Sequence, residues 1–194
     1  VWEYTLEGDL STPEPGQYTS VGVKLPDGAR QLRQYSIISG TDNLYRIAVE
    51  DNGEVAGFLR DNIEVGDTVE TTLAAGDLVM NKGDNPVVLI SQGIGSTPMV
   101  GMLSQVAADR QVTVLHADES ESDHAQREEM KALVEGLNNA TIHTFYRDAG
   151  QWLEIAEHIT PEASVYLCGG TTFLQNVREQ IEKLGEQPAE IRFE

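Results

Sequence analysis

The chain has 194 residues, 40% of them hydrophobic, which is enough for one large domain or two small ones with packed cores. Its 32 acidic residues outnumber the 13 basic ones, and the formal net charge of −19 argues against nucleic acid or an anionic membrane as a partner. A solvated acidic surface that keeps the protein in solution, as in a salty cytoplasm, is the simplest meaning of this charge. The single cysteine, Cys168, excludes an internal disulfide and a four-cysteine iron–sulfur or zinc site.

The apolar runs are far too short to cross a bilayer, and the first residues lack the basic and apolar regions of a signal peptide. A lone cysteine also suits a reducing compartment, so we expect a cytoplasmic protein without membrane contact. The residues Val1–Thr5 and Ala189–Glu194 have strand character at the two ends of the chain. We therefore expect both ends to continue into a longer polypeptide.

Residues 1–82 are predicted to form an antiparallel β-barrel domain. Short alternating segments, separated by turn-forming glycine, proline and asparagine, predict strands at Tyr18–Val23, Gln34–Ile38, Tyr45–Val49 and Thr68–Thr72. One short helix is expected at Val55–Asn62, because Val55, Phe58 and Leu59 are spaced for one helical face. The polar stretch Asn81–Pro86 marks the end of this domain.

Residues 83–194 are predicted to form an α/β domain, because apolar strands alternate with amphipathic helices. The expected strand and helix pairs are Val87–Ser91 with Thr97–Ala108, Val112–His116 with His124–Leu137, Thr141–Phe145 with Trp152–His158, and Val165–Cys168 with Thr172–Leu184. This order predicts a parallel sheet covered on both faces, with ligands at the carboxyl ends of its strands.

A glycine-rich turn, Gly93-Ile94-Gly95-Ser96-Thr97-Pro98, directly follows the first strand of the α/β domain and precedes a helix. The glycines allow a tight turn and close approach of a ligand, Thr97 suits the N-cap, and Pro98 suits the first helical position. Free N–H groups at such a helix start can hold a pyrophosphate. The alternative is that the glycines serve only the geometry of the turn.

The segment Arg33-Gln34-Tyr35-Ser36 lies on a predicted strand, with Arg33 and Tyr35 on one face and Gln34 and Ser36 on the other. A guanidinium can pair with a pyrophosphate, a phenol ring can lie along a flavin, and a hydroxyl can hydrogen-bond a ring nitrogen. The alternative is an edge strand whose polar residues face water.

The order of these motifs resembles the ferredoxin-NADP reductase superfamily. An Arg-x-Tyr-Ser strand comes first, a Gly-x-Gly-x-Thr-Pro turn follows, and Tyr166-Leu167-Cys168-Gly169 stands near the end. The chain also resembles the reductase portion of bacterial flavohaemoglobins, on the additional segments Pro15–Tyr18, Tyr45–Val49 and Gly93–Met99. This resemblance covers essentially the whole chain, and it implies an FAD-binding barrel followed by an NAD(P)-binding domain.

The resemblance also implies roles for individual residues. It places Tyr18 and Gln34 at the FAD, Arg33 at its pyrophosphate, Tyr35 along the flavin, and Ser36 near the flavin nitrogen that receives hydride. The dinucleotide loop corresponds to Gly93, Ile94, Gly95, Ser96, Thr97 and Pro98. Cys168 and Gly169 match positions close to the nicotinamide, and Glu194 matches a glutamate near the flavin, so Ser36, Cys168 and Glu194 are the candidate catalytic residues. The alternatives are that Cys168 is a small buried apolar residue and that Glu194 is only the chain end.

Two substitutions depart from the family pattern. Ala56 stands where many relatives have a serine near the FAD phosphates, and Gly170 stands where a proline often follows Cys-Gly. The aromatic segment that follows the family glutamate, and any globin, are absent from this sequence. Dioxygenase chemistry is therefore not predicted from this chain alone.

The expected function is hydride transfer from NADH to FAD, followed by single-electron transfer to a haem globin in cis or in trans, as in nitric oxide dioxygenase flavohaemoglobin, or to another acceptor. NADH is expected over NADPH, because residues His116–Asp123 contain no arginine or lysine to pair with a 2′-phosphate. The alternatives are a free-standing FAD reductase that feeds an iron–sulfur or oxygenase partner, and a non-enzymatic FAD-binding redox sensor or docking subunit. The four histidines are expected in surface or packing roles, and no metal site is expected.

Overall fold

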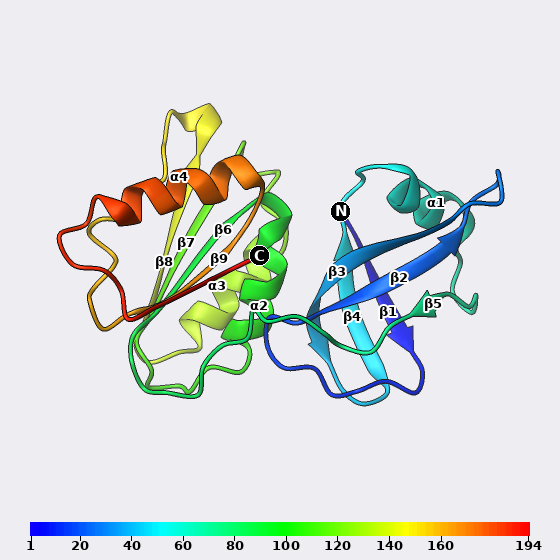
Figure 1. Cartoon of the computed structure of the whole chain (residues 1–194), viewed down its shortest axis with the longest axis horizontal. Helices are drawn as coiled ribbons and strands as arrows, with labels where there is room; N and C mark the ends of the chain where they lie inside the picture. Colours follow the sequence, from blue (N-terminus) through cyan, green and yellow to red (C-terminus); the bar gives the residue numbers. More distant parts are fainter. The chain divides into compact units, whose positions relative to one another are not determined.

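The computed structural model describes residues 1–194, and the chain divides into two compact units, Val1–Val79 and Met80–Glu194. The boundary expected from the sequence follows residue 82. The first unit contains an antiparallel sheet with one helix, and the second contains a parallel sheet with helices on both faces (Figure 1). The expected fold class is therefore confirmed.

The first unit is built on a five-stranded sheet in the order β1-β4-β3-β2-β5, with all neighbours antiparallel. Its strands are β1 (Trp2–Glu7), β2 (Tyr18–Lys24), β3 (Arg30–Gly40), β4 (Leu44–Val49) and β5 (Glu70–Thr71). The register between β3 and β4 shifts between Ile37 and Ser39. Such an irregularity increases the local twist, which helps a long strand to curve around a core.

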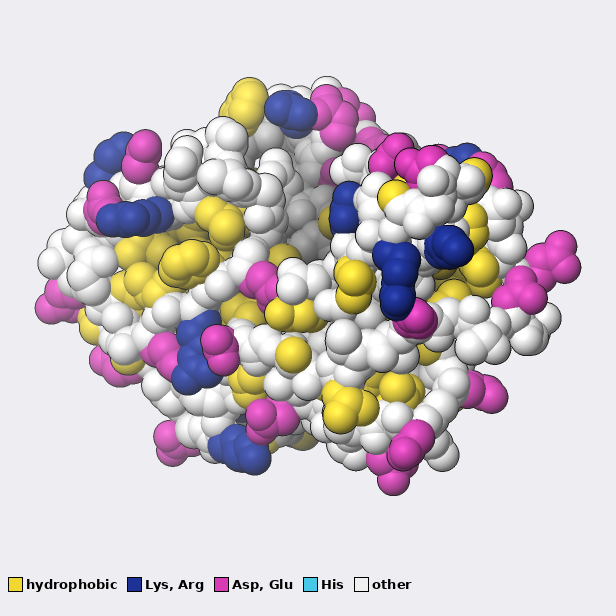
Figure 2. Space-filling model, turned by 45° about the vertical axis from the view of Figure 1, so that its right-hand side comes forward, with side chains coloured by type: hydrophobic (Ala, Val, Ile, Leu, Met, Phe, Trp, Pro, Cys, Tyr) yellow, Lys and Arg dark blue, Asp and Glu magenta, His cyan; other side chains and the backbone are white.

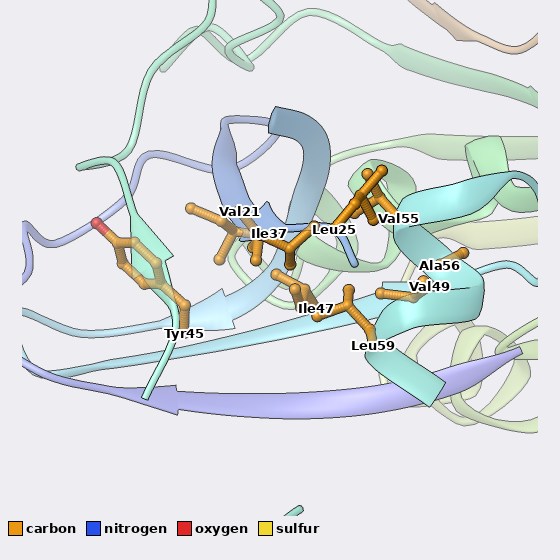
Figure 3. Packing of buried hydrophobic residues seen from close by; sticks show 10 residues of the cluster. Val21, Leu25, Ile37, Tyr45, Ile47, Val49, Val55, Ala56 and Leu59 are labelled. Carbon is orange, nitrogen blue, oxygen red and sulfur yellow. The ribbon is translucent and has the colours of Figure 1, made fainter. Parts of the chain in front are cut away.

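The core of the first unit lies between the strands and helix α1 (Glu54–Asn62), which confirms the helix expected there. Figure 3 shows Val21, Ile37 and Ile47 from the strands pointing toward Val55 and Leu59 of the helix. Each of these side chains is at most 3% exposed, and burying one contributes roughly 1.5–3 kcal/mol. Strand alternation and helical spacing thus bring one apolar face of each element together.

The second unit is built on a five-stranded parallel sheet in the order β10-β9-β6-β7-β8. Its strands are β6 (Val87–Gln92), β7 (Val112–Asp118), β8 (Ala140–Tyr146), β9 (Ser164–Cys168) and β10 (Glu190–Phe193). Helix α4 (Thr171–Glu182) covers one face, and α2 (Ser96–Leu103) and α3 (Arg127–Glu135) cover the other (Figure 1). Because the chain moves from β6 toward β8 and then returns to the other side of β6, the strand order reverses between β6 and β9, the usual place for a ligand in such a sheet.

The helix expected at Trp152–His158 is wrong, because this segment is irregular and contains only a turn. Its backbone is held by the side chain of Gln180, which accepts from the Ile155 N–H at 3.3 Å and donates to the Leu153 carbonyl at 3.1 Å. The Ile155 side chain is fully buried in the core shared with α4. A distant glutamine thus provides hydrogen bonds that a short helix would otherwise make internally.

Two helices of the second unit are shorter than expected. Helix α2 ends at Leu103 rather than at Ala108, and α3 begins at Arg127 rather than at His124. The residues before α3 form turns, and Gln126 has a left-handed backbone, with φ of 54°. The amphipathic pattern predicts the helical region correctly but not the turns that flank it.

Acidic side chains are spread widely over the face of the molecule shown in Figure 2, with basic side chains interspersed among them. On this face, no single acidic patch accounts for the net charge of −19. None of the helices combines the length and the apolar composition that a membrane span requires.

Candidate functional site

The strand pair β2 and β3 carries the barrel residues predicted from the sequence. The register places Tyr18 opposite Ser36, and Thr19 opposite Tyr35. Tyr18, Gln34 and Ser36 therefore share one face of the sheet. Arg33 and Tyr35 share the opposite face, as expected, and Tyr35 packs at the edge of the core there.

Arg33 is exposed, and its guanidinium contacts only neutral oxygens. It donates to the Leu32 carbonyl at 2.8 Å and to Gln31 Oε1 at 2.9 Å. Seven of the nine arginines of the chain pair with carboxylates. Arg110, the other exception, is buried. Arg33 thus keeps an exposed positive charge without a carboxylate partner, in a chain rich in acids.

Tyr18 is held by a loop that the sequence analysis missed. Its backbone exchanges two hydrogen bonds of 2.9 Å with Ala75, and a Cβ on Gly76 would lie 2.9 Å from its ring. Gly76 has φ of 112°, a conformation that favours glycine. On the neighbouring strand, partial burial raises the pKa of Tyr35, an effect that Arg33 partly offsets, so this phenol stays neutral at physiological pH.

The glycine-rich turn of the second unit forms a 3-10 turn, Gly93–Gly95, that continues directly into α2. The expected N-cap role of Thr97 is wrong, because helical winding begins before it and its hydroxyl donates to the Ile94 carbonyl at 2.9 Å. Pro98 lies in the first turn of the helix rather than at its first position, and its missing N–H is tolerated there. Gly93 has φ of 54°, and this positive value favours glycine.

A glycine is required at position 95 because a segment that is distant in the sequence leaves no room for a side chain there. A Cβ at this position would lie 2.4 Å from the carbonyl oxygen of Cys168 and 2.7 Å from its carbonyl carbon. The backbone φ of Gly95 is −62°, which any residue can adopt. The glycine at position 95 is thus needed for close packing against the end of β9 and not for its conformation.

The candidate residues Cys168, Gly169 and Glu194 meet at the carboxyl ends of β9 and β10. The Gly169 N–H donates to the Glu194 carbonyl at 3.3 Å, and the Glu194 N–H donates to the Leu167 carbonyl at 3.0 Å. Cys168 pairs in register with Ser91 of β6, beside the glycine turn. The fold therefore brings Gly95, Cys168, Gly169 and Glu194 to one edge of the sheet.

Burial controls the protonation of these groups. It raises the pKa of the Cys168 thiol to about 12, with a further contribution from the negative charge of Glu194, so the thiol is protonated at neutral pH. Partial burial also raises the pKa of Glu194. Cys168 is therefore a neutral group of low reactivity and not a thiolate nucleophile.

A second polar group at this edge was missed by the sequence analysis. His116, at the end of β7, lies between Ser91 and Asp118, and His124 stacks on it. Both histidines are buried, which agrees with a packing role and excludes a surface one. The only signal in the sequence is an aspartate two residues after a histidine at a strand end, which carries little information without the strand register.

The candidate residues fall into two groups, one on each unit. Tyr18 and residues 33–36 belong to the first unit. Residues 93–98, Cys168, Gly169 and Glu194 belong to the second.

Known proteins match both units. The model of the oxidoreductase NAD-binding domain matches residues 89–179. The flavohemoprotein of Deinococcus radiodurans is 34% identical over 209 residues, which cover 96% of this chain and 52% of that protein. The flavohemoprotein of Vibrio cholerae is 35% identical over 201 residues, which cover 93% of this chain and 50% of that protein. The chain thus spans about half the length of the curated relatives it matches.

Solved structures extend the match over the whole chain. The flavohem-like FAD/NAD-binding domain of nitric oxide dioxygenase from Vibrio cholerae is 31% identical, with a TM-score of 0.87 over 99% of this chain and 90% of that chain. The flavohemoglobin of Malassezia yamatoensis, solved with bound FAD and heme, is 25% identical, with a TM-score of 0.89 over 99% of this chain and 55% of that chain. The resemblance inferred from the sequence motifs is confirmed. The chain belongs to the flavohemoprotein family, of which it represents the FAD/NAD-binding portion.

Proposed function

We propose that this chain is an NADH-dependent flavin reductase that holds FAD on its first unit and passes electrons to a haem globin. The observation that carries the proposal is Arg33, whose exposed guanidinium has only neutral partners beside a face of hydroxyl and amide groups. A chain with a net charge of −19 needs local donors to hold an anionic cofactor. Arg33 is such a donor for a pyrophosphate.

The residues of β2 and β3 fit the chemistry of FAD. Arg33 would pair with the pyrophosphate, the neutral phenol of Tyr35 would offer its ring to the flavin, and Ser36 would provide a hydroxyl for a flavin nitrogen. Tyr18, braced by Gly76, offers a second aromatic surface on the face of Ser36. Ala56 lacks the hydroxyl that many relatives place near the phosphates, which increases the importance of Arg33.

The second unit fits a pyridine nucleotide. The turn at Gly93–Gly95 lets a pyrophosphate approach the start of α2, where N–H groups and the helix dipole favour an anion. Cys168 and Gly169 stand beside this turn and would line the place for a nicotinamide. The small, neutral thiol of Cys168 excludes water there without adding a charge.

When bound, FAD accepts a hydride as two electrons and releases them singly, which a nicotinamide alone does not do. The chain's own residues orient the partners and control the protons around them. Ser36 donates or accepts one hydrogen bond, Cys168 keeps its proton, and the raised pKa of Glu194 makes its carboxyl group a candidate proton carrier.

The choice of NADH over NADPH rests on the loop that follows β7. The fold brings Arg147 and Arg127 to this loop from outside the segment 116–123, where the sequence shows no basic residue. Arg147 pairs with Glu119, and Arg127 pairs with Glu121 and Glu128. Both guanidinium groups are therefore neutralised by carboxylates, which disfavours a 2′-phosphate.

The proposed acceptor is a haem globin, in cis or in trans, because the relatives are flavohemoproteins about twice the length of this chain. The single cysteine supports a cytoplasmic location. A free-standing reductase for an iron–sulfur or oxygenase partner, and a flavin-binding sensor without reductase activity, are the alternatives that experiment must separate.

The test begins with the visible spectrum of the purified chain and its anaerobic titration with NADH. Bound flavin should bleach rapidly, and stopped-flow reduction should be faster with NADH than with NADPH at equal concentration. Transfer to an added globin, compared with an added iron–sulfur protein, then identifies the acceptor class. A colourless protein that takes up no FAD contradicts the proposal, and bound flavin that NADH does not bleach indicates the sensor.

A matched pair of variants tests the role of Arg33. Arg33→Met should weaken FAD binding by roughly tenfold or more, because it removes a charge-assisted pair worth about 1.5–3 kcal/mol. Arg30→Met is the control on the same strand, because Arg30 is exposed and pairs with Glu70. Equal FAD affinity in the two variants contradicts the assignment of Arg33 to the pyrophosphate.

A further inference from the structure

The parallel sheet of the second unit ends on one side at β8, the outermost strand in the order β10-β9-β6-β7-β8 (Figure 1). β8 pairs with β7 along its whole length, from Ala140 to Tyr146, without a shift in register. No strand is hydrogen-bonded to its other side. That side therefore presents an unbroken row of backbone N–H and C=O groups, which is a template for pairing with another strand.

Hydrogen bonds at the two ends of β8 show which of its residues direct their backbone groups outward. The Asn139 carbonyl accepts from the Val112 N–H of β7 at 2.9 Å, so residue 139 faces β7. Tyr146 faces away from β7, because its N–H donates to Gln151 Oε1 at 2.9 Å and its carbonyl accepts from the Gln151 N–H at 3.0 Å. Backbone groups alternate in direction along a strand. Three residues therefore direct their N–H and C=O groups outward without a strand partner: Ala140, Ile142 and Thr144.

β8 differs from the other edge strands of the chain in its charge. Proteins usually keep edge strands from pairing with charged side chains, prolines or bulges. The other three edge strands, β1, β5 and β10, carry Glu3, Glu7, Glu70, Glu190 and Arg192. β8 contains no aspartate, glutamate, lysine, arginine or proline, and its pairing with β7 has no bulge. It is therefore the one edge strand without protection against pairing.

The charge of the chain indicates which partner this strand fits. Two copies, each with a net charge of −19, repel one another most strongly where acidic side chains meet. β8 is the edge at which two copies can pair without opposing acidic side chains of the paired strands. A basic partner would instead be attracted to the acidic strand β1. An uncharged strand thus favours an identical uncharged strand, which is β8 of a second copy.

Antiparallel pairing of β8 with β8 of a second copy uses all the outward groups in one register. With Ile142 opposite Ile142 of the second copy, Ala140 lies opposite Thr144, and Thr144 lies opposite Ala140. Each of these hydrogen-bonded pairs exchanges two bonds, which gives about six backbone hydrogen bonds. The register is two-fold symmetric, as an interface between identical surfaces requires. The side chain of Gln151, bonded to Tyr146, ends the row.

We propose that β8 is a self-association edge, at which two copies of this chain join their five-stranded parallel sheets into one continuous sheet. The paired strands cover far less than the roughly 1,600 Å² of a standard interface, so the dimer is weak and forms at high protein concentration. Because the strands pair antiparallel, the carboxyl ends of the two sheets point in opposite directions. The edges proposed to hold the pyridine nucleotide then lie at opposite ends of the joined sheet.

Sedimentation velocity of the native chain, from about 10 µM to about 1 mM, tests for this association. The sedimentation coefficient should rise with concentration, and more steeply in about 1 M KCl than in about 0.1 M, because salt screens the repulsion between copies. Thr144→Pro removes an outward N–H and leaves the bonds to β7 in place, so it should weaken association roughly tenfold or more. Thr144→Val keeps the N–H and is the matched control, which should associate like the native chain.

Cysteine substitutions at two exposed positions test the register. Thr141 lies opposite His143 of the second copy in a non-hydrogen-bonded pair, with Cα atoms about 4.5 Å apart. A mixture of Thr141→Cys and His143→Cys chains should therefore form a disulfide-linked heterodimer on oxidation. Either variant alone should cross-link much less, because identical positions lie on a diagonal of about 7–8 Å. The native chain is the control for Cys168, whose burial raises the pKa of its thiol to about 12 and slows its oxidation.

Three outcomes overturn the inference. They are a native chain that stays monomeric at about 1 mM in about 1 M KCl, equal association of folded Thr144→Pro and Thr144→Val, and cross-linking of either cysteine variant with itself as efficiently as in the mixture. If Thr144→Pro does not fold, as judged by circular dichroism, the native sedimentation and the cysteine mixture decide the question. None of these measurements depends on flavin or NADH, so their outcome is separate from that of the proposed function.

Discussion

The close approach of Gly95 to the end of β9 makes Gly95→Ala the sharpest test of how the second unit is built. The new Cβ would lie 2.4 Å from the carbonyl oxygen of Cys168 and 2.7 Å from its carbonyl carbon, and both of these atoms belong to the backbone. Ordinary contact begins at 3.4 Å, so the turn and the strand end must separate by about 1 Å. Neither side can yield by rotating a side chain.

Overpacking of this kind costs typically about 1–3 kcal/mol, and we expect the upper half of that range because only backbone can move. The displacement falls on Cys168 and Gly169, which are proposed to lie beside the nicotinamide. A misplacement of about 1 Å lowers reaction rates by up to roughly 100-fold, so flavin reduction should slow by about ten- to a hundredfold. Urea unfolding followed by circular dichroism gives the stability, and anaerobic stopped-flow gives the rate.

Gly93→Ala is the matched control within the same turn. A Cβ at Gly93 meets nothing within 4 Å, but φ of 54° imposes a left-handed backbone, so the expected cost is about 1 kcal/mol from conformation alone. Flavin reduction should be less affected than in Gly95→Ala. The steric account of Gly95 is refuted if Gly95→Ala is as stable as the native chain within about 0.5 kcal/mol and reduces flavin at the native rate.

Four further predictions follow from individual groups. Burial and the nearby His116 lower the pKa of His124 to about 3, so between pH 3 and the ordinary value of 6.5 the unfolded chain binds a proton that the folded chain does not. As the pH decreases through this window, the free energy of unfolding should therefore decrease by up to about 1.4 kcal/mol per pH unit. In urea unfolding, His124→Gln should show a shallower dependence on pH. Arg110 donates to the Asn81 and Asn85 carbonyls at 2.8 and 2.9 Å, so Arg110→Met should lose about 2–4 kcal/mol, against less than about 0.5 kcal/mol for the exposed Arg178→Met. Gly170 has φ of −65° and open space at its Cβ position, so Gly170→Pro should raise the thermal midpoint, with a gain of up to about 1 kcal/mol. Raising KCl from about 0.1 M to about 2 M should raise the urea midpoint, because salt screens the repulsion within a chain of net charge −19.

Each of these expectations has a clear contrary result. Parallel pH profiles for the native chain and His124→Gln would mean that His124 does not remain neutral in the folded state. Equal losses in Arg110→Met and Arg178→Met would show that the buried guanidinium contributes no more than a surface one. A lower thermal midpoint in Gly170→Pro would indicate that the Gly170 N–H is needed, and an unchanged urea midpoint in KCl would show that charge repulsion is already small.

Local patterns in the sequence were sufficient to predict the architecture of the two units and the protein family. Alternation of apolar residues predicts most strands, helical spacing predicts α1 and the approximate position of the helices in the second unit, and the order of three short motifs predicts a flavohemoprotein-like reductase. These signals are local, because they depend on the two repeating geometries of the backbone and on the turn preferences of glycine and proline. Strand alternation also assigns residues 33–36 to their faces, whereas their roles, and that of Tyr18, come from the family resemblance.

Features that depend on neighbours distant in the sequence were determined only by the tertiary structure. Trp152–His158 is irregular because Gln180 holds its backbone, and Gly95 is a glycine because the Cys168 carbonyl occupies the space beside it. Similarly, the fold brings Arg127 and Arg147 to the loop after β7, where they form ion pairs with Glu121 and Glu119, respectively.

The site that changed most between sequence and structure is the histidine pair. The sequence predicts only surface or packing roles for His116 and His124, because nothing near them in the sequence specifies a partner. The parallel register sets Ser91 beside His116, and the turns before α3 lay the ring of His124 on it. Hydrogen bonds and ring contacts need distances of a few ångströms, and only strand pairing and loop closure determine which side chains come that close.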